Sequence, residues 1–422
     1  MTALASRRRR STLLAAGAAV VAIALAGGLA VAGGLTLYHS TGGGSVGSAV
    51  PELVFPKTPT ALLAGVDASG ALASLVVIVV RPDGTGGSVV PVPVSADATS
   101  GEGDERLPIA ESVALEGTAV LEREVGIALS LSFDAVEIAD AARLAELLAP
   151  VAPVQVDLPA DVTDAAGDVV ADAGPAALDA TQLAAVLSAR DPDVAAAEQY
   201  AAAAAVWAGI AETVGDGLVG TQPAPTAADS VDREIVQVSG GPLRSRALAT
   251  LPIEPARNPR GVDVTLLNRS ELALVFGQIA PGRVSAPNSS LSFQVVASFS
   301  PAQLADTGWT NAEIAYRAIN QLLFLRGNVL SVDTTPGDAP TETRLELNDA
   351  TLNTSGVREV FGRLVVEEPA TRLVGIDAVL ILGTEYLTFL EGVDVLPGAT
   401  LATTPAEGRP VDDVEPVEST GG

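Results

Sequence analysis

The sequence contains no cysteine, one histidine and one lysine, and each shortage removes a class of chemistry. Without cysteine there are no disulfides, no thiolate metal ligands and no cysteine nucleophile. His39 stands alone just after an apolar segment, so neither a multi-histidine metal site nor a Ser-His-Asp triad can form. Lys57 leaves almost no place for a P-loop or Schiff-base lysine. Any chemistry must therefore rest on Arg, Asp, Glu, Ser and backbone groups.

Positive charge is scarce as well, since 24 Lys and Arg stand against 51 Asp and Glu, a formal net charge of −27. A surface this acidic repels a phosphate backbone, which argues against nucleic acid as a partner. The length of 422 residues, 48% of them hydrophobic, is enough for two or three domains with cores of their own.

The N-terminal region has the pattern of a membrane anchor. Four arginines, Arg7–Arg10, precede an uncharged apolar stretch from Leu13 to Leu37. As a helix this stretch rises about 37 Å, more than a hydrocarbon core of about 30 Å. The positive-inside rule keeps the arginines in the cytoplasm, so residues 1–38 are expected to be a stub and single-pass anchor in the cell membrane. A cleaved signal peptide is the alternative, because Ala30–Ala32 has the small-x-small form of a cleavage site, but the length favours an uncleaved anchor.

After a Gly/Ser/Pro linker at residues 39–59, alternating strand and helix patterns predict an α/β domain over residues 60–215. Asp179 and Gln182 form a capping box, and Asp191-Pro192 is expected to cap a long Ala-rich helix. Pro91 is expected to push its strand toward an edge or an end. The predicted strands are 61–65, 75–80, 89–94 and 154–158, and the predicted helices are 138–148, 179–187 and the one after Pro192.

A linker or extension at residues 216–261 precedes a predicted smaller C-terminal α+β domain at residues 262–396. Thr310 and Glu313 open its main helix as a capping box. Residues 397–422 are rich in Pro, Glu, Asp, Thr and Gly, which predicts a disordered acidic tail. The predicted strands are 262–267, 272–276, 291–299, 344–347, 364–366 and 374–382.

The element order and four motifs between Thr60 and Val214 resemble the LytR-CpsA-Psr (LCP) family of bacterial envelope proteins. The resemblance implies a three-layer domain with a central mixed sheet and helices on both faces. A weaker match at Leu345–Leu387 resembles the accessory domain that often follows it in actinobacteria. The motifs are Leu62–Asp67 against L-L-L-G-x-D, Val151–Pro159 against G-G-V-x-V-x-V-P, Gly174–Ala184 against G-x-x-x-L-D-G-x-x-A-L, and Ser188–Arg190 against R-x-R.

The resemblance also implies a site. In the LCP family, arginines hold a glycopolymer linked to polyprenyl pyrophosphate, acidic residues hold Mg²⁺, and the polymer is passed to peptidoglycan. Arg forks suit phosphate oxygens, and the metal neutralises the leaving group. Most of these charges are missing from this sequence. The second acid is Ala73, I-P-R-D is Val92–Ser95, the first Arg of R-x-R is Ser188, and G-R-x-x-R-Q-Q is Asp193–Gln199.

Asp67, Arg190 and Gln199 survive as candidate ligand-binding residues, and Asp67 is the candidate metal ligand if Mg²⁺ is used. Asp67 at the end of a strand equally fits a turn-forming Asx residue. Arg190 equally fits a surface or cap residue near the helix junction.

Three functions stay open at this point. The favoured hypothesis is a non-catalytic, membrane-anchored LCP-like scaffold, regulator or glycan binder in envelope assembly. The second is an active glycopolymer phosphotransferase whose arginines come from shifted positions, such as Arg106, Arg123 or Arg143, with at least three guanidinium groups beside Asp67 and Arg190. The third is an unrelated extracytoplasmic binding module on a similar scaffold, for which no tunnel for a lipid tail is expected.

Overall fold

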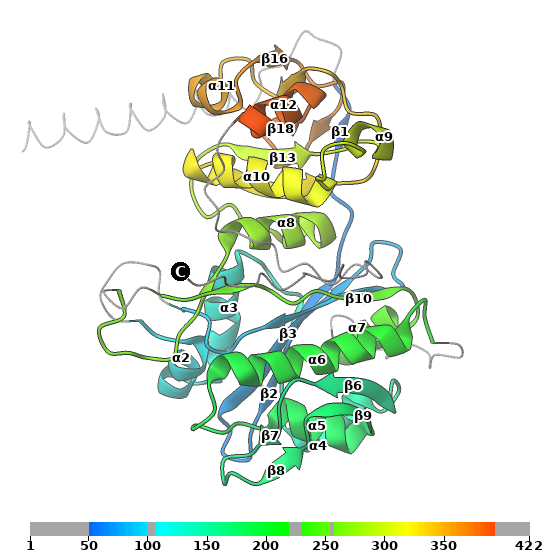
Figure 1. Ribbon diagram of the computed structural model, residues 1–422, viewed down its shortest axis with the longest axis vertical. Coiled ribbons are helices and arrows are strands. Elements are labelled where there is room, and N and C mark those ends of the chain that lie inside the picture. The colour runs from blue at the N-terminus through cyan, green and yellow to red at the C-terminus, as the bar shows by residue number, and fades with distance from the viewer. Residues whose placement is uncertain (1–49, 99–105, 219–229, 254–256, 393–422) are drawn as a thin grey trace, which may run out of the picture. The chain divides into compact units, whose positions relative to one another are not determined.

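The computed structural model describes residues 50–98, 106–218, 230–253 and 257–392 (Figure 1). The apolar segment Leu13–Leu37 and the acidic tail at 397–422 lie outside these residues, so both predictions stay predictions. Within the described ranges, no helix is both long enough and apolar enough to cross a membrane. By its internal contacts the chain divides after Pro51, and all elements named below belong to the unit that starts at Glu52.

A mixed five-stranded sheet lies at the centre of the first half of this unit. Its middle strand is apolar and β-branched, and every residue of it is buried. The outer pairs β10–β4 and β2–β5 are parallel, whereas β3 runs antiparallel to both of its neighbours. The strand order is β10 (Leu243–Ser245), β4 (Gly87–Val92), β3 (Leu72–Val80), β2 (Thr60–Val66) and β5 (Ala135–Ala139).

Alternation along these strands sends side chains into two separate cores, because successive residues of a strand point to opposite faces. Leu63, Val76 and Ile78 enter one core. Leu62 and Val77 enter the other. The first core is covered by α4 (Ala141–Leu148), α5 (Ala180–Ser188), α6 (Ala196–Val214), α7 (Val231–Ser239) and the hairpin β6 (Val154–Leu158) with β9 (Gly174–Leu178). The second is covered by α2 (Ile109–Glu116), η1 (Thr118–Val120), α3 (Leu121–Leu129) and α8 (Arg269–Ile279).

Helices therefore cover both faces of a central mixed sheet, as the sequence predicts, and the α/β fold class is confirmed. The capping box of Asp179 and Gln182 is present at the start of α5. Trp207, Ile210 and Val214 of α6 are buried in the first core. Pro91 lies inside β4, beyond the three residues that β10 pairs, so this strand is an edge where the proline occurs.

Two local predictions in this half are wrong. Ile138 and Ala139 belong to β5, and the helix starts only after Asp140, whose carboxylate accepts the N–H of Arg143. Asp191 does not cap α6, which begins at Ala196. A distant carboxylate does so instead, since Asp263 Oδ2 accepts the N–H of Ala196 at 2.8 Å.

A second mixed five-stranded sheet lies in the C-terminal half and has a core of its own. Thr310 and Glu313 form the expected capping box at the start of α10. The strand order is β14 (Asn328–Asp333), β13 (Ser292–Val296), β18 (Ala378–Ile381), β15 (Thr343–Leu347) and β16 (Leu364–Glu367). The helices of this half are α9 (Pro301–Leu304), α10 (Asn311–Phe324), α11 (Ser355–Phe361) and α12 (Thr384–Gly392).

Residues 272–276, predicted as a strand, form the middle of helix α8 instead. Asn268 caps this helix by accepting the N–H groups of Ser270 and Glu271. Short apolar runs do not separate strand from helix by periodicity, and this run is buried on two sides. Phe276 enters the core of the first sheet and Leu274 that of the second. Because α8 serves both cores, the domain limits expected from the sequence stay predictions.

Short strand pairs complete the described chain. They are β1 (Glu52–Leu53) with β17 (Arg372–Leu373), β7 (Val162–Thr163) with β8 (Val169–Ala171), and β11 (Thr250–Leu251) with β12 (Leu266–Leu267). The predicted strand at 262–267 is reduced to β12, and the one at 374–382 to β18.

Candidate functional site

Asp67 lies directly after β2 and uses its carboxylate to build a turn. Its Oδ1 accepts the N–H of Ser69 at 2.8 Å, the hydroxyl of Ser69 at 2.6 Å and the N–H of Ala71 at 2.9 Å. Burial raises the pKa of Asp67, but these hydrogen bonds and the charge of Arg190 together hold it below its ordinary value. The Asx-turn interpretation of this residue is therefore realised in the structure.

Arg190 is brought to Asp67 by the chain that joins α5 to α6. Of the arginines, it alone acts on the pKa of Asp67 in the described part of the chain. Its side chain is half-buried, and no ion pair forms between the two residues. The structure thus brings together two of the three surviving candidates.

Gln199, the third candidate, holds a loop. Its amide nitrogen donates to the carbonyl oxygens of Asp191 at 2.6 Å and Val194 at 2.9 Å. Asp191 in turn accepts the hydroxyl of Thr163 and the N–H of Asp193. These hydrogen bonds hold the pKa of Asp191 below its ordinary value. The amide nitrogen of Gln199 is occupied by these two carbonyl oxygens, so the side chain fixes the approach to α6.

A small cavity lies beside this loop and includes Ala73, where the family has its second acid. Its volume of about 20 Å³ is room for about one water molecule. The charged residues of its lining are all acidic: Asp161, Asp191 and Glu198. A polyprenyl chain does not fit in this space, and a pyrophosphate would face carboxylates with no arginine in the lining.

Other side chains at or beside the positions where the resembling family has charged residues take part in packing and in hydrogen bonds within the fold. Ser188 donates its hydroxyl to the carbonyl oxygen of Ala184 at 2.6 Å, within its own helix. Val94 packs against the core on the opposite face of the sheet. Ser74 donates its hydroxyl to the carbonyl oxygen of Leu187 at 2.6 Å, which ties β3 to the end of α5. These three side chains therefore stabilise the fold around Asp67 and Ala73.

The shifted arginines of the second hypothesis do not converge on Asp67. Arg106 is buried against Asp97 at 2.6 Å, in the core on the other face of the sheet. Arg123 on α3 pairs with Glu116 and Glu124. Arg143 on α4 pairs with Glu137 and Asp232, and these two carboxylates raise its pKa above the ordinary arginine value. Each of the three guanidinium groups is already matched by carboxylates elsewhere.

Asp67 and its surroundings do not fit a magnesium site. Mg²⁺ takes six oxygen ligands in near-octahedral geometry and is usually held by one or two carboxylates with substrate phosphates. One oxygen of Asp67 is already occupied by three donors, and the neighbouring family acid is Ala73. Among the described residues, no three acidic or histidine side chains are grouped to hold a metal ion.

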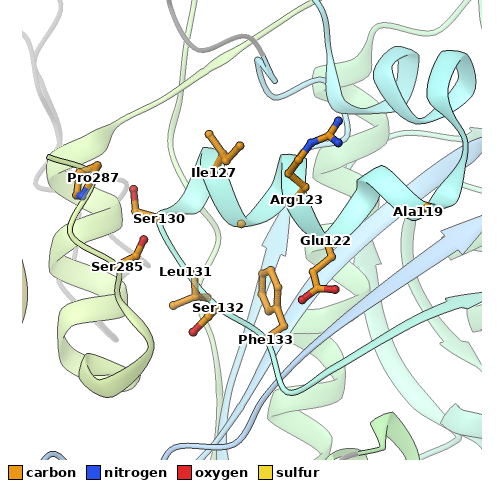
Figure 2. A pocket seen from close by; sticks show the side chains of 11 residues that line it. Ala119, Glu122, Arg123, Ile127, Ser130, Leu131, Ser132, Phe133, Ser285 and Pro287 are labelled. Atoms are coloured by element: carbon orange, nitrogen blue, oxygen red, sulfur yellow. The ribbon is translucent and has the colours of Figure 1, made fainter. Parts of the chain in front are cut away.

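A larger hollow lies on the opposite face of the sheet, between the C-terminal end of α3 and the segment around Ser285 (Figure 2). Its volume is about 610 Å³, within the range of small-molecule sites. A bridge between Leu131 and Val284 joins its two sides. No local pattern in the sequence indicates this hollow, because the two segments are about 150 residues apart. The lining residues are Ala119, Glu122, Arg123, Gly126, Ile127, Ser130, Leu131, Ser132, Phe133, Ser285 and Pro287.

Comparison with known proteins returns no matching family model and no matching curated protein. Several solved structures match over about half of this chain. B. subtilis TagT is 19% identical over 52% of this chain and 87% of its own, with a TM-score of 0.36. The LytR-CPS2A-psr family protein YwtF (TagT), solved with bound octaprenyl pyrophosphate lipid, is 17% identical over 51% and 85%, with a TM-score of 0.36.

B. subtilis TagV is 11% identical over 52% of this chain and 94% of its own, with a TM-score of 0.37. One of these structures, YwtF (TagT), is a LytR-CPS2A-psr family protein. Because the identities and TM-scores are this low, the functional proposal below is built on this chain's own residues.

Proposed function

We propose that this chain is a membrane-anchored, extracytoplasmic LCP-like protein of the bacterial cell envelope that acts without catalysis, as a scaffold, regulator or glycan binder. The anchor and orientation rest on the sequence pattern of Arg7–Arg10 and the apolar stretch Leu13–Leu37. The envelope role rests on the four motifs between Thr60 and Val214. Peptidoglycan or a glycopolymer carried by polyprenyl phosphate is the expected partner, in the second case bound through its glycan and not its lipid carrier, and no nucleic acid is expected.

The observation that carries the non-catalytic part is the lining of the small cavity. Transfer from a polyprenyl pyrophosphate builds negative charge on the leaving group, and several preorganised cations must stabilise it. Here the cavity is lined by three carboxylates and has room for about one water. Arg190 is the arginine that acts on Asp67, and Arg106, Arg123 and Arg143 are paired elsewhere. This geometry favours a scaffold or regulator over both a phosphotransferase and a binder of the lipid carrier.

A second candidate function follows from the same cavity. An extracytoplasmic binding module unrelated to lipid carriers needs no tunnel for a lipid tail. The cavity beside Ala73 is too small for such a tail, which is consistent with a module of this kind. Binding to isolated cell-wall material separates the two, because the envelope scaffold should be retained by it and an unrelated module should not.

The proposal is tested by a transfer assay with the full chain in detergent, with Mg²⁺, a glycopolymer linked to polyprenyl pyrophosphate, and peptidoglycan as acceptor. The expected result is no polymer transfer above the rate without protein, for the natural chain and for Arg190→Ala alike. Turnover that Arg190→Ala abolishes would show that the site is catalytic and would overturn the proposal.

A further inference from the structure

The hollow beside α3 presents hydroxyl groups that the protein itself does not use. Ser130 and Ser285 are joined through the backbone, since the N–H of Ser285 donates to the carbonyl oxygen of Ser130 at 2.8 Å. Within the described residues, neither of their hydroxyls makes a hydrogen bond. A serine hydroxyl can donate one hydrogen bond and accept two. Two such groups on neighbouring chain segments offer paired donors and acceptors to a ligand in the hollow.

Ser130 occupies a position at which a side chain is unusual. It follows α3 with φ 52° and ψ 45°, the left-handed conformation in which helices usually end on glycine. Glycine there would give the same turn without strain, but it would remove the hydroxyl from the hollow. The side chain at Ser130 therefore adds a polar group to the hollow that the helix end does not require.

Apolar groups lie between these polar ones. Phe133 lines the hollow while part of its ring packs against the core below. Ile127 on α3 is 57% exposed at the same hollow. Figure 2 shows these side chains around the hollow together with the serines. Apolar surface interleaved with hydroxyls suits a ligand whose own surface alternates CH faces with hydroxyl groups.

The charges of the hollow exclude an anion. Arg123 donates to both Glu116 and Glu124, so its positive charge is already matched. Glu122, which also lines the hollow, forms no ion pair with any described residue and adds a negative charge. The whole chain carries −27, which further disfavours a phosphate-bearing ligand. A carboxylate can still accept hydrogen bonds from neutral hydroxyls.

We propose that this hollow binds an uncharged saccharide segment of an envelope glycan. Sugar rings of the segment pack a CH face against Phe133 or Ile127, while hydroxyls along the segment bond to Ser130, Ser285 and Glu122. This inference takes its ligand class from the proposed envelope role, but it concerns a different face of the sheet from Asp67 and Arg190. The open form of the hollow predicts weak binding.

The proposal is tested by ligand-observed NMR on the full chain in detergent, with chitotriose, maltotriose and cellotriose as uncharged probes and inorganic pyrophosphate as the charged probe. At least one trisaccharide is expected to bind and pyrophosphate is not. Ser285→Ala removes one hydrogen bond and is expected to weaken binding about 2- to 10-fold. Ser289→Ala, an exposed serine of the same segment outside the hollow, is the matched control and should leave Kd unchanged.

Phe133→Leu tests the stacking contribution, because leucine keeps an apolar side chain against the core while the ring is lost. It is expected to weaken binding more than Ser285→Ala does. No binding of any trisaccharide at millimolar concentration would overturn the inference, as would binding that Ser285→Ala and Phe133→Leu leave unchanged. Pyrophosphate binding that Ser285→Ala weakens would contradict the uncharged ligand class. Arg190→Ala should leave saccharide binding intact, so this test fails or succeeds separately from the transfer assay.

Discussion

Arg106 tests whether the arginines of this chain serve the fold or a phosphate ligand. Its guanidinium lies 2.6 Å from Asp97, and both side chains are almost fully buried, at 4% and 6% exposure. Replacing Arg106 with methionine keeps an unbranched side chain but removes the positive charge that compensates the Asp97 carboxylate. Breaking a buried ion pair from one side typically costs about 3–5 kcal/mol, because the remaining charge stays in a poorly solvated place.

Urea unfolding of Arg106→Met, followed by Trp207 fluorescence in a Trp309→Phe background, should show that loss. The double variant Arg106→Met with Asp97→Leu should recover most of it, since an apolar pair of similar volume often replaces a buried ion pair without loss. Arg123→Met is the matched control: this arginine is 55% exposed, so water screens its ion pairs and the loss of stability should be far smaller than that of Arg106→Met. An Arg106→Met protein of natural stability, or a double variant no better than the single one, would refute the structural role.

Three further predictions concern stability and topology. Burial raises the pKa of Glu271, so the folded state holds the proton of this carboxyl more tightly than the unfolded state does. The free energy of unfolding therefore falls as the pH rises from 4.5 through the folded-state pKa. In urea unfolding, Glu271→Gln should be more stable than the natural chain at pH 7, with a smaller difference or none near pH 4. In Gly209→Ala the new Cβ would clash with the carbonyl oxygen of Gln155, so thermal unfolding should show a loss of stability of about 1–3 kcal/mol. The loss should be less than about 0.5 kcal/mol for the exposed Ala208→Ser on the same helix. Protease added to intact spheroplasts should remove residues beyond 38 and leave an N-terminal fragment, and full protection of the chain would overturn the predicted orientation.

The sequence was informative wherever a local pattern decided the structure. The apolar run of β3 and the capping boxes at Asp179 and Thr310 depend on residues within a few positions of one another. Predictions failed where a distant residue decided. The start of α6 is fixed by Asp263, which lies 67 positions away and was not visible as a cap from the sequence. The strand predicted at residues 272–276 is part of helix α8 instead, because burial against two cores hides its helical period.

The candidate site shows the same division. The motifs of the sequence predict that Asp67 and Arg190 belong to one site. In the structure, Arg190 is close enough for its charge to lower the pKa of Asp67. The sequence does not show that the loop held by Gln199 and three carboxylates leave only a small cavity beside Ala73, because these residues meet only in the folded chain. The hollow beside α3 was missed entirely, because it forms only when Ser130 and Ser285 are joined across the fold.

Binding of a polyprenyl pyrophosphate tests the central claim most directly, because it asks whether the position of the family's site can hold the lipid carrier at all. Native mass spectrometry of the full chain in detergent, with Mg²⁺ and a polyprenyl pyrophosphate, reports binding without requiring turnover. We predict no specific adduct for the natural chain, and spectra that Arg190→Ala does not change. A stoichiometric adduct that disappears in Arg190→Ala would contradict the account, because it would show that one arginine beside Asp67 is enough to hold the carrier.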